Sequence, residues 1–279
     1  MNAVFEEFAG GLNHPEGVCW NPFDGRVYAG GEGGEIYAVT LGGDVQVVAV
    51  TGGSMLGLAV DGRGRVYACD EGNGEIVRVD PATGALEMYA RGPGGANLDT
   101  PNMLAFDASG MCYVTCSGED GSPSVVRIDP DRSVRVWTTA VPAYPNGMCL
   151  DAGGRRLVIV ESHRPALVRV AIEPDGSAGA PVVIALLPES DPDGVTLGAD
   201  GFYYVTLYRP DGIVRVDPAT GDIETVVKDP LARVFDAPTN LAFVGASLDR
   251  VVVANVGDRF LSIGDVGTTG APLMYPELP

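Results

Sequence analysis

Short apolar runs, separated by turns that contain glycine, recur along the whole chain. Residues 56–90 (LGLAVDGRGRVYACDEGNGEIVRVDPATGALEMYA) show the pattern most clearly. An apolar run, the run VYAC, the alternating segment IVRV and the run LEMYA follow one another, with a turn between each pair. These lengths and turn residues predict four short β-strands. A run such as residues 66–69, which is apolar on both faces, suits a strand that is packed on both sides.

This four-stranded unit is repeated six times. Its first strand begins each time with a related motif: HPEGVCW (14–20), MLGLAV (55–60), PNMLAF (101–106), PNGMCL (145–150), PDGVTL (192–197) and PTNLAF (238–243). Measured at the residue that aligns with Gly17, the intervals between copies are 40, 46, 44, 47 and 46 residues. A period of this length is typical of one blade of a β-propeller. The WD-repeat type is disfavoured because the chain has no Trp-Asp signature.

The two ends of the chain predict how the ring closes. The last copy has three clear strands and then stops at APLMYPELP, without an obvious fourth strand. The N-terminal segment VFEEFAGGLNHPEG (4–17) has the pattern of a fourth strand that leads into the next motif. We therefore expect residues 4–8 to complete the sixth blade, which hides the free sheet edges. The sequence predicts an all-β fold: one six-bladed propeller domain over residues 1–279, with four antiparallel strands per blade.

Composition and charge narrow the possible functions. The 39 glycines and 21 prolines are spread along the chain, as expected for many tight turns, and a hydrophobic content of 46% allows a large core. A net charge of −19 disfavours nucleic acid and membrane surfaces as partners and attracts cations. The sequence shows no signal peptide and no apolar run near the length of about 18 residues that a membrane helix needs, so a soluble, cytoplasmic protein is expected. The five cysteines contain no C-x-x-C pair and are expected to be buried thiols.

One position in each copy carries candidate chemistry. The residue just before the Gly17 position opens the innermost strand and is expected to point toward the central channel. This slot holds Glu16, Leu56, Asn102, Asn146, Asp193 and Thr239. Four of the six are carboxylates or amides, which are costly to bury unless they are paired. If the ring closes, their oxygens converge near the axis, and oxygen donors of this kind are the ligands of hard cations such as calcium.

Two alternatives remain open for this slot. Asn and Asp beside Pro and Gly often form turn hydrogen bonds to the backbone instead of binding an ion. If an ion is bound, oxygen ligands also admit magnesium, manganese or iron, while zinc is less favoured without His or Cys in the slot. Residues 189–200 (ESDPDGVTLGAD) approach an EF-hand calcium loop, but Pro192, the absence of flanking amphipathic helices and Asp200 at the last ligand position argue against it.

The whole chain resembles the gluconolactonase, senescence marker protein (regucalcin) and luciferin-regenerating enzyme family of six-bladed propellers. The resemblance rests on HPEG, TPNML, YPNGM and DPDGV occurring in order at blade spacing. It implies that Glu16, Asn146 and Asp193 bind one catalytic divalent metal, with calcium as the first choice and magnesium, manganese, iron or zinc as alternatives. It also implies that Asn102 lies beside the metal and contacts substrate or metal.

The chain departs from the sugar-lactone members of this family beside Asn102. Those members commonly have an acidic residue after this Asn and an Arg just before it, whereas here Met103 follows and Thr100-Pro101 precede. The departure weakens a gluconolactone assignment and favours a less polar lactone or ester. The ends of the second strands should form the mouth of the pocket, and of these residues Tyr208 and His163 are predicted to contact substrate.

These residues lead to a hypothesis and two competitors. The first is a metal-dependent lactonase-type hydrolase that opens a small lactone or related ester at the central channel. In it Asp193 acts as catalytic base and metal ligand, Asn102 orients the substrate, and Glu16 balances charge. The second is a binding propeller with a structural calcium ion. The third is a lyase, isomerase or phosphoester hydrolase on the same metal platform. The oligomeric state is left open.

Overall fold

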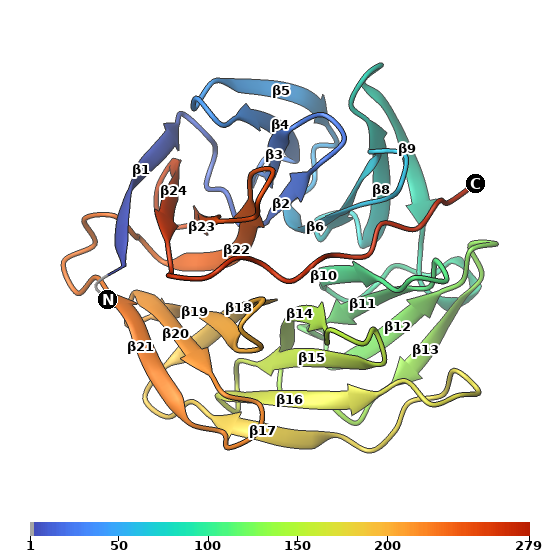
Figure 1. Ribbon diagram of the computed structural model, residues 1–279. Helices are drawn as coiled ribbons and strands as arrows, with labels where there is room; N and C mark the ends of the chain where they lie inside the picture. The colour runs from blue at the N-terminus through green and yellow to red at the C-terminus, as the bar shows by residue number, and fades with distance from the viewer. Residues whose placement is uncertain (1–2) are drawn as a thin grey trace.

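The computed structural model describes residues 3–279 and contains six four-stranded antiparallel sheets arranged around a central axis (Figure 1). The innermost strands of neighbouring sheets contact one another all the way round, and the contact between the first and last of them closes the ring. The predicted six-bladed propeller is therefore confirmed. Within the described residues the helical structure consists of one short 3-10 turn, η1 (Pro93–Gly95), and no helix there could cross a membrane.

The first five blades run outward from the axis in chain order, and the sixth takes its outermost strand from the N-terminus. The innermost strands are β2 (Val18–Asn21), β6 (Met55–Val60), β10 (Pro101–Phe106), β14 (Pro145–Leu150), β18 (Asp191–Leu197) and β22 (Pro238–Val244). The second strands are β3 (Arg26–Gly30), β7 (Val66–Asp70), β11 (Cys112–Cys116), β15 (Arg156–Glu161), β19 (Tyr203–Arg209) and β23 (Arg250–Asn255). The third strands are β4 (Glu35–Thr40), β8 (Glu75–Asp80), β12 (Ser124–Ile128), β16 (Ala166–Ala171), β20 (Gly212–Val216) and β24 (Phe260–Asp265). The outermost strands are β5 (Val45–Val50), β9 (Ala85–Ala90), β13 (Val134–Thr138), β17 (Val182–Leu186), β21 (Ile223–Lys228) and β1 (Val4–Gly10).

The sixth blade contains both ends of the folded ring. Strand β1 is its outermost strand and pairs antiparallel with β24, with Val4 opposite Asp265 and Gly10 opposite Phe260. The predicted closure by the N-terminal segment is confirmed, and the strand extends two residues beyond the predicted 4–8. This pairing gives the sixth blade its fourth strand and joins the two ends of the folded ring within one sheet.

The core lies between the faces of adjacent blades. The second strands are buried along nearly their whole length, as in β7 and β11, where every residue is buried. The outermost strands are more exposed, and in β9 the first four of six residues are exposed. This difference explains why runs such as residues 66–69 are apolar on both faces. Four of the five cysteines are buried free thiols as predicted, and Cys149 is partly buried.

A β-bulge marks the slot position in five of the six innermost strands. The pairing register shifts between Met55 and Leu58, and equivalent shifts occur in β10, β14, β18 and β22. In the first blade the slot residue, Glu16, lies just ahead of β2. A bulge turns a side chain out of the regular alternation of the strand. The slot residues are thereby freed from the pattern that buries their neighbours between blades.

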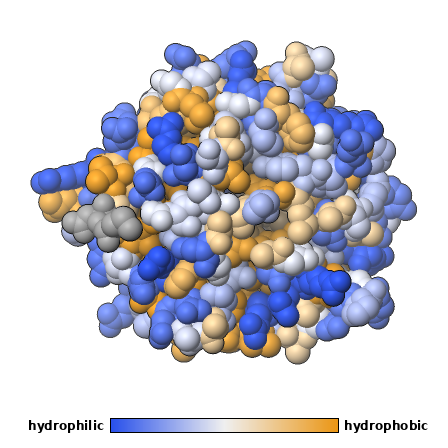
Figure 2. Space-filling view, in the orientation of Figure 1, coloured by the Kyte–Doolittle hydropathy of each residue, from blue (hydrophilic) through white to orange (hydrophobic). Residues whose placement is uncertain are grey.

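The C-terminal segment after β24 crosses the face of the ring that lies away from the slot residues (Figure 1). Ala271 N–H donates to Leu197 O at 2.9 Å, and Gly62 N–H donates to Pro276 O at 2.8 Å, so the segment links the fifth blade to the second. Leu278 is buried in the core between the second and third blades. Figure 2 shows this face, with hydrophobic residues near its middle and hydrophilic ones around much of the rim.

Ring closure by β1 leads to a stability prediction. Phe5 is buried, its ring centroid lies 5.0 Å from that of Phe235, and a Cβ atom at Gly264 would lie 2.6 Å from the Phe5 ring. Phe5→Ala should therefore lower the free energy of unfolding by about 3 kcal/mol, measured by chemical denaturation. The matched control is Val4→Ala, at a side chain that is 77% exposed in the same strand, which should change it by less than about 0.5 kcal/mol. Equal effects of the two substitutions would contradict the closure argument.

Candidate metal centre

The slot residues follow one another around one end of the channel, where the innermost strands begin. Thr115 Oγ1 donates to Asn146 O at 2.8 Å, and Thr206 Oγ1 hydrogen-bonds Thr239 O. Thr239 Oγ1 donates to Glu16 O at 2.7 Å, which joins the sixth blade to the first. These bonds fix the backbone carbonyl groups of Asn146, Thr239 and Glu16 against the neighbouring blade.

Glycine after the slot allows this close approach. A Cβ atom at Gly147 would lie 2.4 Å from Asp193 O, and one at Gly194 would lie 2.6 Å from Thr239 O. Real Cβ atoms do not come this close, so a larger residue there would push the blades apart. The recurring Gly in the motif is thus a packing requirement around the axis.

The chain approaches the slot through a repeated backbone conformation. His14, Thr100, Tyr144 and Ala237 have φ between 44° and 61°, and each precedes a proline that is followed by the slot residue. Left-handed backbone at a non-glycine residue is unfavourable by roughly 1 kcal/mol or more. Four equivalent blades maintain it, which indicates that the surrounding structure enforces the turn that leads the chain into the innermost strand.

Four of the slot side chains carry buried oxygens without a partner. Glu16 Oε2, Asn102 Oδ1, Asn146 Oδ1 and Asp193 Oδ1 are buried and make no hydrogen bond within the described residues. Only one other buried side-chain polar atom there, the Tyr89 hydroxyl, shares this property. An unsatisfied buried acceptor is unfavourable by about 1–3 kcal/mol, and by more when it is charged. These oxygens make none of the turn hydrogen bonds that the alternative interpretation of the slot requires.

The two carboxyl groups affect each other's protonation. Burial raises the pKa of Glu16 well above its usual value, and the nearby Asp193 charge raises this pKa further. Burial raises the pKa of Asp193 to about 7, while the neighbouring Asn146 amide opposes this rise. Glu16, Asn146 and Asp193 are therefore brought close together. Both carboxyl pKa values rise mainly because the two groups are buried away from water.

Ser162, which sequence reasoning did not select, orients Asn146. Asn146 Nδ2 donates to Ser162 Oγ at 3.1 Å, and Ser162 Oγ donates to Pro192 O at 2.7 Å. The hydroxyl thus accepts from one slot side chain and holds the residue before Asp193. Because its nitrogen is engaged, the Asn146 amide directs its Oδ1 atom away from Ser162.

The other two slot residues lie outside the oxygen set. Leu56 has no polar side chain, and the Thr239 hydroxyl is engaged with Glu16 O. The remaining donors suit a hard cation, because two carboxylates and two amide carbonyls match the ligands that calcium takes. Among residues 3–279 no group of three or more His, Cys, Asp or Glu side chains could hold a metal. A metal at the slot would therefore depend on the two amides as well as on the two acids.

Comparison with known proteins identifies the family. The model of the SMP-30/gluconolactonase/LRE-like region matches residues 6–256, which is most of the chain. The chain belongs to this family. A comparison with curated proteins found no match.

Solved structures of similar fold accompany this family match. A gluconolactonase from Xanthomonas campestris superimposes with a TM-score of 0.82 at 20% identity, covering 94% of this chain and 89% of the other. A calcium-binding regucalcin from Agrobacterium tumefaciens gives 0.75 at 18% identity, with 100% and 97% coverage. A streptogramin B lyase gives 0.70 at 16% identity, with 95% and 98% coverage. At these identities the structures establish a shared fold.

An aromatic pair lies at the rim beside the slot of this SMP-30/gluconolactonase/LRE-like chain. The rings of Tyr144 and the exposed His163 lie 4.5 Å apart between centroids, and the Tyr144 hydroxyl donates to Glu119 Oε1 at 3.1 Å. Burial and Glu119 raise the pKa of Tyr144, and Asp193 and Glu16 add to this rise, so the phenol lies within electrostatic reach of both slot carboxyls. Tyr144 was missed from the sequence, although its place two residues before Asn146 could have indicated it.

The other rim residues have different roles. Tyr208 is 38% exposed and stacks against the Arg209 guanidinium, 5.0 Å from its ring centroid. Asp70 binds the following turn through Asn73, and Glu161 accepts from Ala143 N–H and pairs with Arg164. These acids hold loops in place. Substrate contact by Tyr208 and His163 stays a prediction.

Proposed function

We propose that this protein is a metal-dependent hydrolase that opens a small lactone or related ester at the slot end of its channel. The observation that carries the proposal is the group of four unpartnered buried oxygens on Glu16, Asn102, Asn146 and Asp193. Burial of two carboxyl groups with raised pKa values is unfavourable without a positive charge beside them. Family membership, with gluconolactonases among the named members, supports the lactone as substrate class.

The slot residues have separate proposed roles. Glu16, Asn146 and Asp193 would hold a divalent cation, with calcium favoured by the all-oxygen donor set. Such a cation, when bound, supplies a Lewis acid for the ester carbonyl and lowers the pKa of water. Asn102, whose amide oxygen is also buried without a partner, would orient the substrate.

Asp193 is the proposed general base. Its carboxylate has two oxygens, so one can hold the cation while the other takes a proton from water and returns it. Water oxygen then bonds to the carbonyl carbon, the bond from that carbon to the ring oxygen breaks, and the proton held by Asp193 passes to the ring oxygen. The products are a carboxylic acid and an alcohol on one molecule.

The slot end favours a less polar substrate than a sugar lactone. Met103 takes the place that the sugar-lactone members give to an acidic residue, and its Sδ lies 3.7 Å from Asn240 Nδ2. The thioether offers only a weak acceptor to a polyhydroxylated ring. Alkyl-substituted lactones fit this surface better.

A panel of lactones tests the proposal. Alkyl-substituted γ- and δ-lactones, gluconolactone and aryl esters are assayed by acid release with calcium, magnesium, manganese or zinc, and with a chelator. Turnover that requires a metal and is faster for an alkyl lactone than for gluconolactone is expected. Metal binding without turnover of any of them would favour the structural-ion alternative. A product that has gained a double bond and no oxygen from heavy-oxygen water would favour a lyase.

Ser162 offers a sharper test of the slot. Ser162→Ala should weaken calcium affinity by roughly tenfold or more, because outer residues that orient ligands commonly contribute this much. Ser117 is the matched control, since it occupies the same place in the third blade and donates to Pro145 O at 3.0 Å without touching a slot side chain. Calorimetric titration of both variants gives the comparison. Equal affinities for Ser162→Ala and Ser117→Ala would contradict the orienting role.

A further inference from the structure

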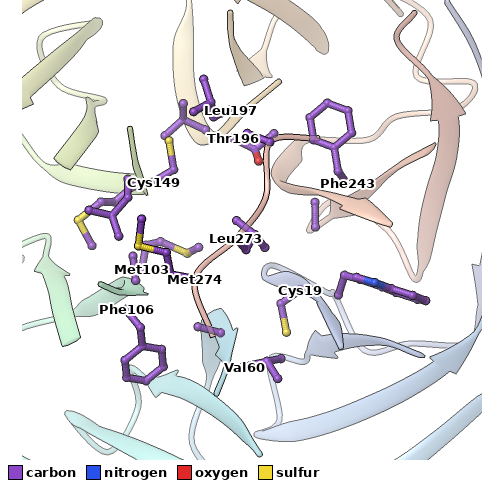
Figure 3. Close-up of a pocket in the computed structure, with 18 of the residues that line it drawn as sticks. Cys19, Val60, Met103, Phe106, Cys149, Thr196, Leu197, Phe243, Leu273 and Met274 are labelled. Atoms are coloured by element: carbon purple, nitrogen blue, oxygen red, sulfur yellow. The ribbon is translucent and has the colours of Figure 1, made fainter. Parts of the chain in front are cut away.

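A second chamber lies in the channel at the far ends of the innermost strands. It is a cavity of about 120 Å³, and every blade contributes to its wall (Figure 3). The residues labelled in Figure 3 include at least one from each innermost strand, among them Cys19, Val60, Phe106, Cys149, Leu197 and Phe243. The slot residues are at the opposite ends of these strands and do not line it.

Two side chains separate this chamber from the slot. Four blades have Gly after the slot, but the third has Met103 and the sixth has Asn240. These two blades face each other across the ring, and Asn240 Nδ2 lies 3.7 Å from Met103 Sδ. Met103 also lines the chamber. The Met103–Asn240 contact therefore spans the channel and divides it.

The C-terminal segment closes the other end. Residues 271–275 line the chamber, and Leu273 and Met274 lie over it (Figure 3). The segment is held on both sides, by Leu197 O and by Gly62 N–H. Leu273 is 50% exposed, so the cover borders solvent at this point.

The wall offers no charge to a ligand. Asp151 is the one acidic residue of the lining, and its carboxylate accepts from Arg155 N–H and Arg156 N–H and pairs with Arg156 Nη1 at 2.9 Å. Burial raises the pKa of the Cys19 and Cys149 thiols, so both are neutral. Three methionines and two cysteines are part of the lining: Met103, Met148, Met274, Cys19 and Cys149.

We propose that this chamber is a binding site for one small, neutral aromatic molecule of roughly six to eight non-hydrogen atoms. Apolar cavities of about 150 Å³ bind benzene, so a chamber of this size admits one ring. Sulfur atoms at the edge of an aromatic ring add a favourable contact, which selects aromatic over aliphatic ligands. The site is independent of the slot, because the Met103–Asn240 contact lies between them.

The test uses the full-length protein with isotopically labelled methionine methyl groups, with toluene as probe and a chelator present throughout. Saturable shifts of the Met103, Met148 and Met274 signals are expected, without a shift of Met88, which is 50% exposed on β9. Benzoate, the charged counterpart of toluene, should bind at least tenfold more weakly. No shift up to the solubility limit of toluene, non-saturable shifts that include Met88, or equal binding of benzoate would overturn the proposal.

Two variants keep the test specific. Cys149→Phe fills the chamber from its wall and Leu273→Trp fills it from the cover, and either should reduce toluene affinity by at least tenfold. Val182→Phe, on the outermost strand of the fourth blade and 46% exposed, should leave the affinity unchanged. Because a chelator is present and no turnover is measured, failure here would leave the proposed hydrolase untouched.

Discussion

Replacing Asp193 by asparagine is expected to abolish lactone opening and to stabilise the metal-free protein at the same time. The substitution removes the proposed general base, whose loss commonly lowers rates by about 10²–10⁴-fold. It also removes one of two carboxylates, so calcium affinity should fall by at least about 100-fold. The Asp193 carboxyl is buried beside Glu16, and its charge raises the pKa of that group, so a neutral amide relieves repulsion. Turnover, calorimetric titration and thermal melting with a chelator measure the three effects.

A matched control distinguishes the loss of the slot carboxylate from the change in net charge. Asp191 is exposed and lies two residues earlier in β18, so Asp191→Asn makes the same chemical change outside the slot. It should keep both turnover and calcium affinity within about twofold of the parent protein, as expected for a surface position. Full activity of Asp193→Asn, or equal losses in both variants, would remove the basis of the proposed mechanism. A metal-free Asp193→Asn protein that melts below the parent would contradict the buried charge repulsion.

The fold could be predicted because the sequence motifs that specify it are short and recur in every blade. Each blade repeats the same turn residues and the same slot motif, and the unpaired N-terminal strand indicated closure before the pairing of β1 with β24 was known. The period of the motif then fixes the number of blades. None of this required knowledge of side-chain rotamers.

The candidate site could be proposed from the sequence only where one residue per repeat contributes to it. Glu16, Asn102, Asn146 and Asp193 align at one slot, so the sequence alone could group them. Ser162 could not be found this way, because its role depends on a rotamer that reaches both Asn146 Nδ2 and Pro192 O.

Two other features depend on geometry that a one-dimensional pattern does not contain. Tyr144 owes its position beside the slot to a left-handed backbone at φ 61°. Met103 and Asn240 are far apart in the chain, and their contact depends on the width of the channel, which the sequence does not give. The slot motif lies next to Tyr144, Met103 and Asn240 in the sequence, but it does not show which residues they contact.

Calcium should reverse the pH dependence of stability. Glu16 and Asp193 have raised pKa values in the folded, metal-free protein, so this state binds more protons than the unfolded chain between about pH 4 and pH 7. Stability then falls as pH rises through this window, and Asp193 contributes a loss on the order of 4 kcal/mol. A bound cation favours the charged carboxylates, so calcium affinity should increase up to about pH 7 and oppose this loss. Denaturation across this pH range, with chelator and with saturating calcium, measures both curves. The doubly substituted Glu16→Gln, Asp193→Asn protein is the control and should respond to neither calcium nor this titration. Parallel curves for the parent protein with and without calcium would mean that no cation binds the two carboxylates.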